Sequence, residues 1–270
     1  MTSKTTPRTR LAMAFLGFLL VEPCAAQVLE TETARLRLPG AVQGGLNYEF
    51  QTSAEGHESA VPFLFEYGIT DRLELAVEPV AATRIRPRVG PKAAGFGDTE
   101  MTLTYLAMRE SRSFPALAFA GEIKFATARN PLIGTGEPDY AAYLIASKRF
   151  GRLDTHFNLT YTFVGQPPGP EVNGSKLSNT IGGALAGMYT VGERFRIYAE
   201  VLATTSASGG GAEAPVSPTG TLPPEAAGEE IVGTIGAGFY LRPKLFISLG
   251  VSYDNNHAVL FRPGITFRSK

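Results

Sequence analysis

The chain has 270 residues, enough for one large domain or two ordinary ones. Its 25 basic and 25 acidic residues balance, so the overall charge gives no indication of nucleic acid or another strongly charged partner. The hydrophobic fraction of 44% and the charged fraction of only 19% exclude an intrinsically disordered chain.

The first 26 residues have the three parts of a secretory signal peptide. Lys4, Arg8 and Arg10 form the basic start, residues 11–21 the apolar core, and residues 24–26 a run of small side chains. The core is shorter than the ~20 residues that a membrane-spanning helix needs, which disfavours an anchor. We expect export of the chain and cleavage after residue 26.

Cys24 lies within this segment and is the only cysteine of the chain. It would carry the lipid of a lipoprotein, but Glu22 and Pro23 directly before it fit that alternative poorly. After cleavage the exported chain has no cysteine, so it must be stable without disulfides.

Beyond residue 40, apolar and polar side chains alternate with a period of two. Between residues 43 and 51 the even positions carry Leu46, Tyr48 and Phe50, and between 153 and 163 the odd positions are mainly Leu, Phe and Tyr. A strand places two such sets on opposite faces. The pattern predicts about twelve strands, and it is less regular in two of them, 139–149 and 178–190, where Ala and Gly occur on both faces. The expected strands are at roughly 41–52, 59–69, 72–83, 98–109, 114–127, 139–149, 153–164, 178–190, 194–205, 230–241, 244–254 and 258–268.

The connections between these segments alternate in length, except that a final short one at 255–257 breaks the trend. Short turns on one side and long loops on the other are typical of outer-membrane barrels, and an even strand count returns both termini to the periplasm. Lipid offers backbone groups no partner, so the sheet must close. We expect an all-β, up-and-down antiparallel transmembrane barrel over 41–270; a soluble β-sandwich is the alternative. The short connections are 68–71, 110–113, 150–152, 191–193, 242–243 and 255–257, and the long ones 53–58, 84–97, 128–138, 165–177 and 206–229.

If the apolar set faces lipid, the polar set faces the interior. Eight of its charged or titratable members are acidic, which indicates a water-filled pore that mildly favours cations. The alternative is a filled interior in which Lys124, Arg196 and Arg262 pair with Glu side chains. We favour a narrow, partly plugged passage. The candidate lining residues are Glu49, Glu66, Glu74, Glu78, Glu100, Glu122, Lys124, Asp154, His156, Arg196, Glu200 and Arg262.

Small residues leave room along the inner wall for an apolar solute or for the segment 27–40. That segment, which includes Arg35 and Arg37, is a plug, a periplasmic tail or an irregular strand; an even strand count favours plug or tail. The small residues are Ala116, Ala118, Ala120, Gly182, Ala184, Ala186, Gly236 and Gly238.

Catalysis by a lipid hydrolase would require a Ser activated by a nearby His. His57 and His257 fall in expected outer loops, with Ser59 close to His57, and we expect no Ser in register with His156. No nucleophile motif surrounds any Ser, and no spacing indicates a metal site. We therefore expect no enzyme activity, no catalytic residues, no metal and no cofactor.

Two expected outer loops have distinctive charge. Basic side chains in loop 84–92 can bind lipopolysaccharide phosphates or simply be solvated. Loop 206–229, together with Glu230 directly after it, has four Glu, no basic residue, and Gly and Pro. The basic residues are Arg84, Arg86, Arg88 and Lys92.

Three short stretches carry a family resemblance. The sequences Tyr-Gly-Ile-Thr-Asp-Arg-Leu-Glu-Leu at 67–75, Gly-Phe-Gly-Asp at 95–98 and Ser-Lys-Arg-Phe-Gly at 147–151 resemble those of outer-membrane transporters of the "MetA-pathway of phenol degradation" type. The chain departs from that pattern with Ala-Thr-Ala at 126–128 and with a C-terminus that is not aromatic. The resemblance implies uptake of small, often aromatic, molecules.

The sequence thus predicts an outer-membrane channel or passive transporter for small molecules in a Gram-negative bacterium. An outer-membrane lipid hydrolase and a structural barrel without transport are the alternatives. Expected partners are outer-membrane lipids, lipopolysaccharide and a small solute, without nucleic acid; the sequence leaves the oligomeric state open.

Overall fold

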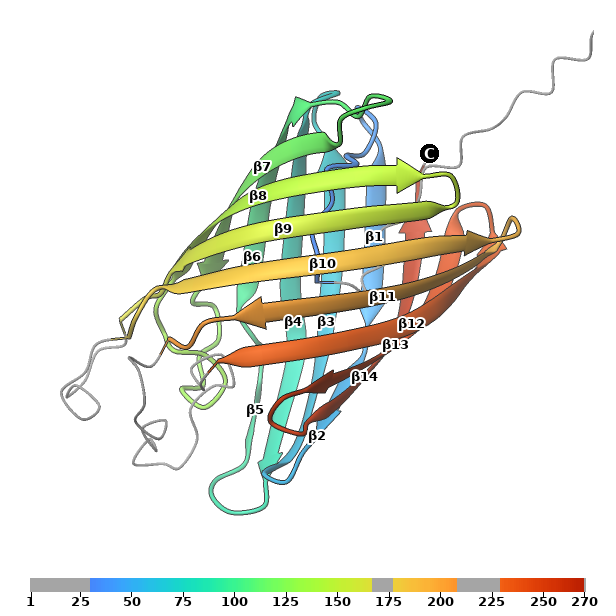
Figure 1. Ribbon diagram of the computed structural model, residues 1–270. Coiled ribbons are helices and arrows are strands. Elements are labelled where there is room, and N and C mark those ends of the chain that lie inside the picture. The colour runs from blue at the N-terminus through green and yellow to red at the C-terminus, as the bar shows by residue number, and fades with distance from the viewer. Residues whose placement is uncertain (1–29, 167–176, 208–228, 270) are drawn as a thin grey trace, which may run out of the picture.

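The computed structural model describes residues 30–166, 177–207 and 229–269 (Figure 1). The expected signal peptide, and most of the expected loops 165–177 and 206–229, lie outside these residues. Within the described part, no helix is long and apolar enough to cross a membrane.

The described chain forms one antiparallel sheet that closes into a barrel of twelve strands, as predicted. The two less regular segments also form strands, β8 and β10. The elements are β1 Val42–Asn47, β2 Glu49–Thr52, β3 Gly56–Gly68, β4 Leu73–Pro87, β5 Ala93–Gly95, β6 Thr99–Met108, β7 Ala116–Phe125, β8 Asp139–Phe150, β9 Leu153–Phe163, β10 Thr180–Val191, β11 Phe195–Thr204, β12 Glu230–Arg242, β13 Leu245–Asp254 and β14 Val259–Arg268.

Two of the twelve barrel strands are interrupted. β1 and β2 follow each other along the same two neighbours, β3 and β14, and β5 and β6 follow each other along β4. Pairing of β1 and β2 with β14 closes the barrel. Closure gives partners to the edge strands, which would otherwise present unpaired backbone groups.

The two faces of the sheet differ in polarity, as β9 illustrates. Phe157 and Leu159 are each 46% exposed, whereas His156 and Asn158 on the opposite face are 4% and 2% exposed. Large apolar side chains are exposed in the same way around the cylinder. The apolar face therefore lies outside and the polar face inside, the inverse of a soluble sandwich.

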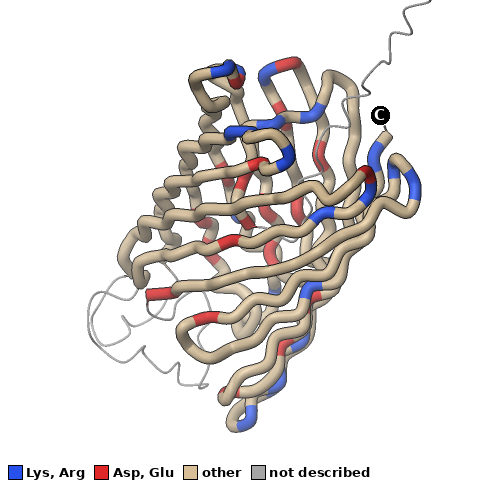
Figure 2. Tube along the Cα trace, turned by 45° about the vertical axis from the view of Figure 1, so that its right-hand side comes forward, with Lys and Arg blue, Asp and Glu red and all other residues tan. Residues whose placement is uncertain are grey.

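The barrel has a turn end and a loop end. The turn end, at the top of Figure 1, carries the C-terminus and the connections 69–72, 109–115, 151–152, 192–194 and 243–244. The loop end carries the connections 53–55, 88–92, 126–138 and 255–258, and the described residues that follow β9 and β11 or precede β10 and β12, namely 164–166, 177–179, 205–207 and 229. Figure 2 shows Lys and Arg gathered at the turn end.

Two expected loops are shorter than predicted. β3 begins at Gly56 and β4 continues to Pro87. At the end away from their 69–72 turn, the two paired strands therefore extend past the limits expected for them. His57, Arg84 and Arg86 are therefore strand residues and not loop residues. Cross-strand pairing of Gly56 with Pro87 sustains this extension, which the polar character of the stretch concealed.

Residues 30–40, here called the inner segment, run inside the barrel. Thr31 and Arg37 are 5% and 8% exposed although neither belongs to a strand. The segment reaches the turn end near residue 40, where Gly40 N–H donates to Gly68 O at 2.8 Å. Side chains on the inner face of the barrel hold the rest of it.

Candidate functional site

The interior at the turn end is organised around Arg35. Its guanidinium donates to both carboxylate oxygens of Asp154 at 2.8–2.9 Å and to Glu110 Oε2 at 2.6 Å. Arg149 also donates to Asp154, at 2.7 Å. Bidentate pairs of this type are strong and geometrically specific, so they fix the position of the inner segment relative to β9.

Glu110 lies in the connection between β6 and β7 and has several basic partners. Lys148 Nζ is 3.4 Å from Oε1, which also accepts the Arg149 N–H at 3.0 Å. Burial opposes the charged form, but the hydrogen bonds and charges of Arg149, Arg35 and Lys148 outweigh it, so the pKa of Glu110 lies below its ordinary value. The carboxylate therefore carries full negative charge where it contacts Arg35.

At mid-height, β8 and β9 bind the main chain of the inner segment. Asn158 accepts the Glu32 N–H at 2.6 Å and donates to Glu32 O at 2.9 Å. Ser147 Oγ accepts the Ala34 N–H at 2.9 Å and lies 2.9 Å from His156 Nδ1. These contacts satisfy backbone groups that would otherwise be buried without partners.

The expectation that no Ser is in register with His156 was wrong, since Ser147 is its cross-strand partner. The irregular pattern of β8 hid this pairing. Ser147 is 1% exposed and lies beneath Ala34, so its hydroxyl is an anchor for the inner segment with no approach for an ester.

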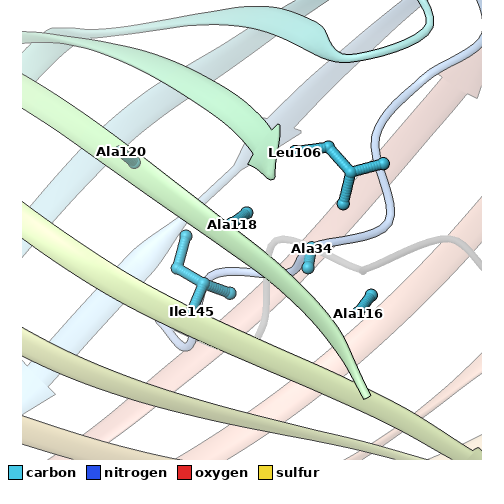
Figure 3. Packing of buried hydrophobic residues seen from close by; sticks show 6 residues of the cluster. All are labelled: Ala34, Leu106, Ala116, Ala118, Ala120 and Ile145. Atoms are coloured by element: carbon cyan, nitrogen blue, oxygen red, sulfur yellow. The ribbon is translucent and has the colours of Figure 1, made fainter. Parts of the chain in front are cut away.

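Small side chains make room for the inner segment. Ala34 packs against an apolar cluster on β6, β7 and β8, in which Ala118 and Ile145 are fully buried (Figure 3). Of the two expected uses of this space, the structure shows the segment in it. The other members of the cluster are Leu106, Ala116 and Ala120.

Farther toward the loop end, the first described residues contact β11 and β14. Glu30 and Glu49 both pair with Arg262, at 2.6 and 2.8 Å. The Thr31 N–H donates to Glu200 at 2.6 Å, and its hydroxyl donates to the same carboxylate. The inner segment thus crosses the interior from this group to the turn end.

A second group of carboxylates surrounds Arg37. Its Nε lies 3.5 Å from Glu66 and 3.8 Å from Glu74, and its N–H donates to Glu74. Gln43 on β1 donates to Glu66. Gln43 also accepts a hydrogen bond from Arg268 Nε at 2.9 Å, so two guanidinium groups and two carboxylates belong to this group.

The inner face of the wall formed by β4, β6 and β7 carries more acidic than basic side chains: Glu74, Glu78, Glu100 and Glu122, against Lys124, the cross-strand partner of Glu100. Glu78 and Glu100 are cross-strand partners, and Glu122 accepts the Tyr143 hydroxyl at 3.0 Å. Glu32 of the inner segment lies within electrostatic range of these carboxylates. Low-dielectric walls focus such a field, which raises the local concentration of cations.

None of the twelve candidate lining residues is exposed, and the structure joins several of them to partners that the sequence did not reveal. Lys124 pairs with Asp139, and the Arg196 guanidinium lies 5.4 Å from the centre of the Tyr240 ring. Of the three cations expected to pair with Glu, Arg262 does so, and Lys124 is the cross-strand partner of Glu100. The partners of Lys124 and Arg196 lie on neighbouring strands, so only the strand register could have identified them.

Some of the expected room along the wall is filled by aromatic rings. A side chain at Gly236 would come within 2.1 Å of the Tyr198 ring, and one at Gly238 within 2.0 Å of the Phe246 ring. The space left by these glycines is therefore occupied by the Tyr198 and Phe246 rings and does not widen the interior.

Among the described residues, no group of His, Cys, Asp or Glu side chains could hold a metal ion. The two histidines at the loop end each have an aromatic neighbour: His57 stacks on Phe50 with ring centres 5.8 Å apart, and His257 lies beside Tyr253.

No family model matches the chain, and no curated protein matches it in sequence. In structure the chain is similar to an outer membrane channel from Pseudomonas putida F1, with a TM-score of 0.64 and 13% identity over 86% of this chain and 96% of that one. It is also similar to the NanC porin (TM-score 0.60, 9% identity, 83% and 98% covered) and to the KdgM porin in complex with disordered oligogalacturonate (0.51, 12%, 83% and 98%). At identities this low, the structural similarity establishes a shared barrel fold alone.

Proposed function

We propose that the protein is an outer-membrane channel through which small molecules diffuse passively, with the inner segment as a plug that narrows the passage. The observation that carries this proposal is a polar, acidic interior within an apolar cylinder. A bilayer matches the outside, and water and polar solutes match the inside. The fold shared with channels and porins supports the same function.

The proposal that the inner segment is a plug rests on the type of contact that holds it. Barrel side chains such as Asp154, Ser147 and Asn158 bind it, while its own residues 30–40 form no strand with the wall. Removal of a few side chains can therefore release it without breaking the barrel. Residues 27–29 would continue the plug from a signal peptide cleaved after residue 26.

The orientation follows from the lengths of the connections. We propose that the turn end faces the periplasm and the loop end the exterior, as in other outer-membrane barrels. The exposed basic residues at the loop end of β4 and in the 88–92 connection would then contact lipopolysaccharide phosphates. These are Arg84, Arg86, Arg88 and Lys92, and basic residues are visible at the lower tip in Figure 2.

Two properties of the solute are proposed, its charge and its chemical class. The carboxylates of Glu78, Glu100 and Glu122 favour cations over anions in the aqueous passage. Membership among transporters of the "MetA-pathway of phenol degradation" type would extend the class to hydrophobic or aromatic compounds.

Reconstitution tests this function directly. The full exported chain in planar bilayers is expected to give small, cation-favouring currents, measured from the reversal potential in a KCl gradient. Glu78→Gln with Glu100→Gln should weaken the preference, whereas Glu55→Gln in the exposed 53–55 connection should not. Absence of current together with ester hydrolysis would support the hydrolase instead, and absence of both a structural barrel.

A further inference from the structure

The wall of the barrel has a gap between β4 and the strand formed by β5 and β6. β4 pairs with β6 over residues 73–79 and with β5 over residues 83–85, but residues 80–82 have no cross-strand partner on that side. The Gly97 N–H, which donates to Val80 O at 3.0 Å, spans this gap. Figure 1 shows β5 beside the loop end of β4, separate from β6.

The local sequence maintains the gap. Pro79 has no N–H to donate to a neighbouring strand. At Gly97 a side chain would come within 2.8 Å of Val80 Cβ and 3.2 Å of Thr83 Oγ1, so the chain passes close to β4 only because this residue is Gly. The close approach of residue 97 to β4 therefore requires Gly.

A cavity of about 930 Å³ lies at the gap, within the size range of small-molecule sites. Its outward side is apolar and open, because Pro79, Ala81 and Ala94 are exposed and Phe96 is 71% exposed. The complete lining is Pro79, Val80, Ala81, Ala94, Gly95, Phe96, Gly97, Thr99, Thr127, Arg129, Asn130 and Pro131.

The remaining lining is polar and contributed by the connection 126–138. Thr127 Oγ1 lies 3.2 Å from Thr99 Oγ1, and Arg129 and Asn130 complete this side. Arg129 is the basic residue of the lining, which contains no Asp or Glu. On the inner face of the same strands, Glu78 would repel an anion, whereas Glu100 is the cross-strand partner of Lys124. An anionic group in the cavity is therefore directed toward Arg129 and away from the interior.

We propose that this cavity is a binding site for a small apolar molecule with one anionic end, and that the ligand reaches it from the lipid-facing side. The ring or chain of the ligand contacts Ala81, Ala94 and Phe96, and its anionic group pairs with Arg129. A dissolved aromatic acid and an anionic membrane lipid share this chemistry. The site does not depend on conduction through the barrel, so the proposed channel function can fail while this site stands.

Photolabelling of the full exported chain in detergent micelles tests the site, with 4-benzoylbenzoate as the probe and mass spectrometry to locate the label. We expect label on peptides that contain residues 79–81 and 94–99. Ala81→Phe, which fills the cavity, should remove that label. Ala203→Phe should not, because Ala203 is exposed on the outer face of β11, away from the cavity.

A second pair of measurements tests the anionic end. Arg129→Gln should reduce labelling by 4-benzoylbenzoate roughly two- to five-fold, as for an exposed ion pair, and leave labelling by neutral benzophenone unchanged. Suppression by added phosphatidylglycerol would identify a lipid as the ligand; no suppression would favour a dissolved acid. Label spread evenly over the outer face, or equal loss of label in Ala81→Phe and Ala203→Phe, would overturn the proposal.

Discussion

Arg35 and Asp154 form a bidentate ion pair inside the barrel, with Arg35 Nε 2.9 and 2.8 Å from the two carboxylate oxygens. The pair joins the inner segment to β9 across 119 positions of sequence. Loss of one partner from a buried pair costs about 3–5 kcal/mol. The cost here falls toward the lower end, because Arg149 remains bound to Asp154.

Arg35→Ala is therefore expected to loosen the inner segment. Ala34 is 3% exposed, so a Cys at this position should react slowly with a membrane-impermeant maleimide. The rate should rise at least about ten-fold when Arg35→Ala is added, since ten-fold corresponds to only about 1.4 kcal/mol. Arg152→Ala in the exposed 151–152 turn serves as the control. Equal rates in both backgrounds would show that Arg35 does not hold the segment.

Overpacking of the small-residue wall should have the same effect by a different route. Ala118 is 0% exposed and belongs to the cluster with Ala34, so Ala118→Phe should displace the segment at a cost of about 1–3 kcal/mol. Ala199→Phe, on the outer face of β11, adds the same volume without contact with the segment. Bilayer currents should increase in the first variant alone; unchanged currents would place the segment elsewhere.

Acid should weaken the plug through Glu110. Its pKa is depressed while Arg35, Lys148 and Arg149 surround it. A depressed pKa stabilises the bound state above the ordinary value of about 4.3, and this contribution is lost as the pH falls through the depressed value. Because Arg35 is one of the groups that depress the pKa of Glu110, the contribution of Glu110 to holding the segment is lost in acid, and currents should rise as the pH falls below the ordinary range of a Glu carboxyl.

Glu110→Gln should raise the current at neutral pH and remove this component of the acid response. Glu55→Gln, in an exposed connection, should retain the wild-type profile. If the difference between wild type and Glu110→Gln did not change with pH, Glu110 would have no part in holding the segment.

The outer face should not tolerate charge in the middle of a strand. Phe157 is 46% exposed on β9, and Arg at such a position costs about 2–4 kcal/mol at the bilayer midplane. Val89→Arg, at a residue 87% exposed in the 88–92 connection, should cost almost nothing. Urea titrations of folding into lipid vesicles measure both; equal stabilities would mean that Phe157 does not face lipid.

The period-two pattern was sufficient to predict the strands, because a bilayer outside and water inside impose opposite polarity on alternate residues. In β9 that opposition is complete enough to place Asp154, His156 and Asn158 together on one face. It was weaker in β8, where Ala and Gly occur on both faces, and the pairing of Ser147 with His156 was missed for this reason.

Contacts of the inner segment were beyond sequence reasoning. Arg35 and Glu110 are 75 positions apart, and only the closed barrel brings them together. The interrupted pairing at Gly97 was hidden too, because a Gly in a polar stretch indicates a loop as readily as a close approach of two strands. The extended β3–β4 hairpin was missed because Arg84 and Arg86 read as loop residues.

Removal of residues 30–40 tests the account most directly. Planar-bilayer recordings of the exported chain and of the same chain without these residues should show a larger and steadier conductance after deletion, with cation preference retained by the carboxylates of the wall. Equal conductances, or no conductance from either protein, would contradict an interior passage narrowed by the inner segment.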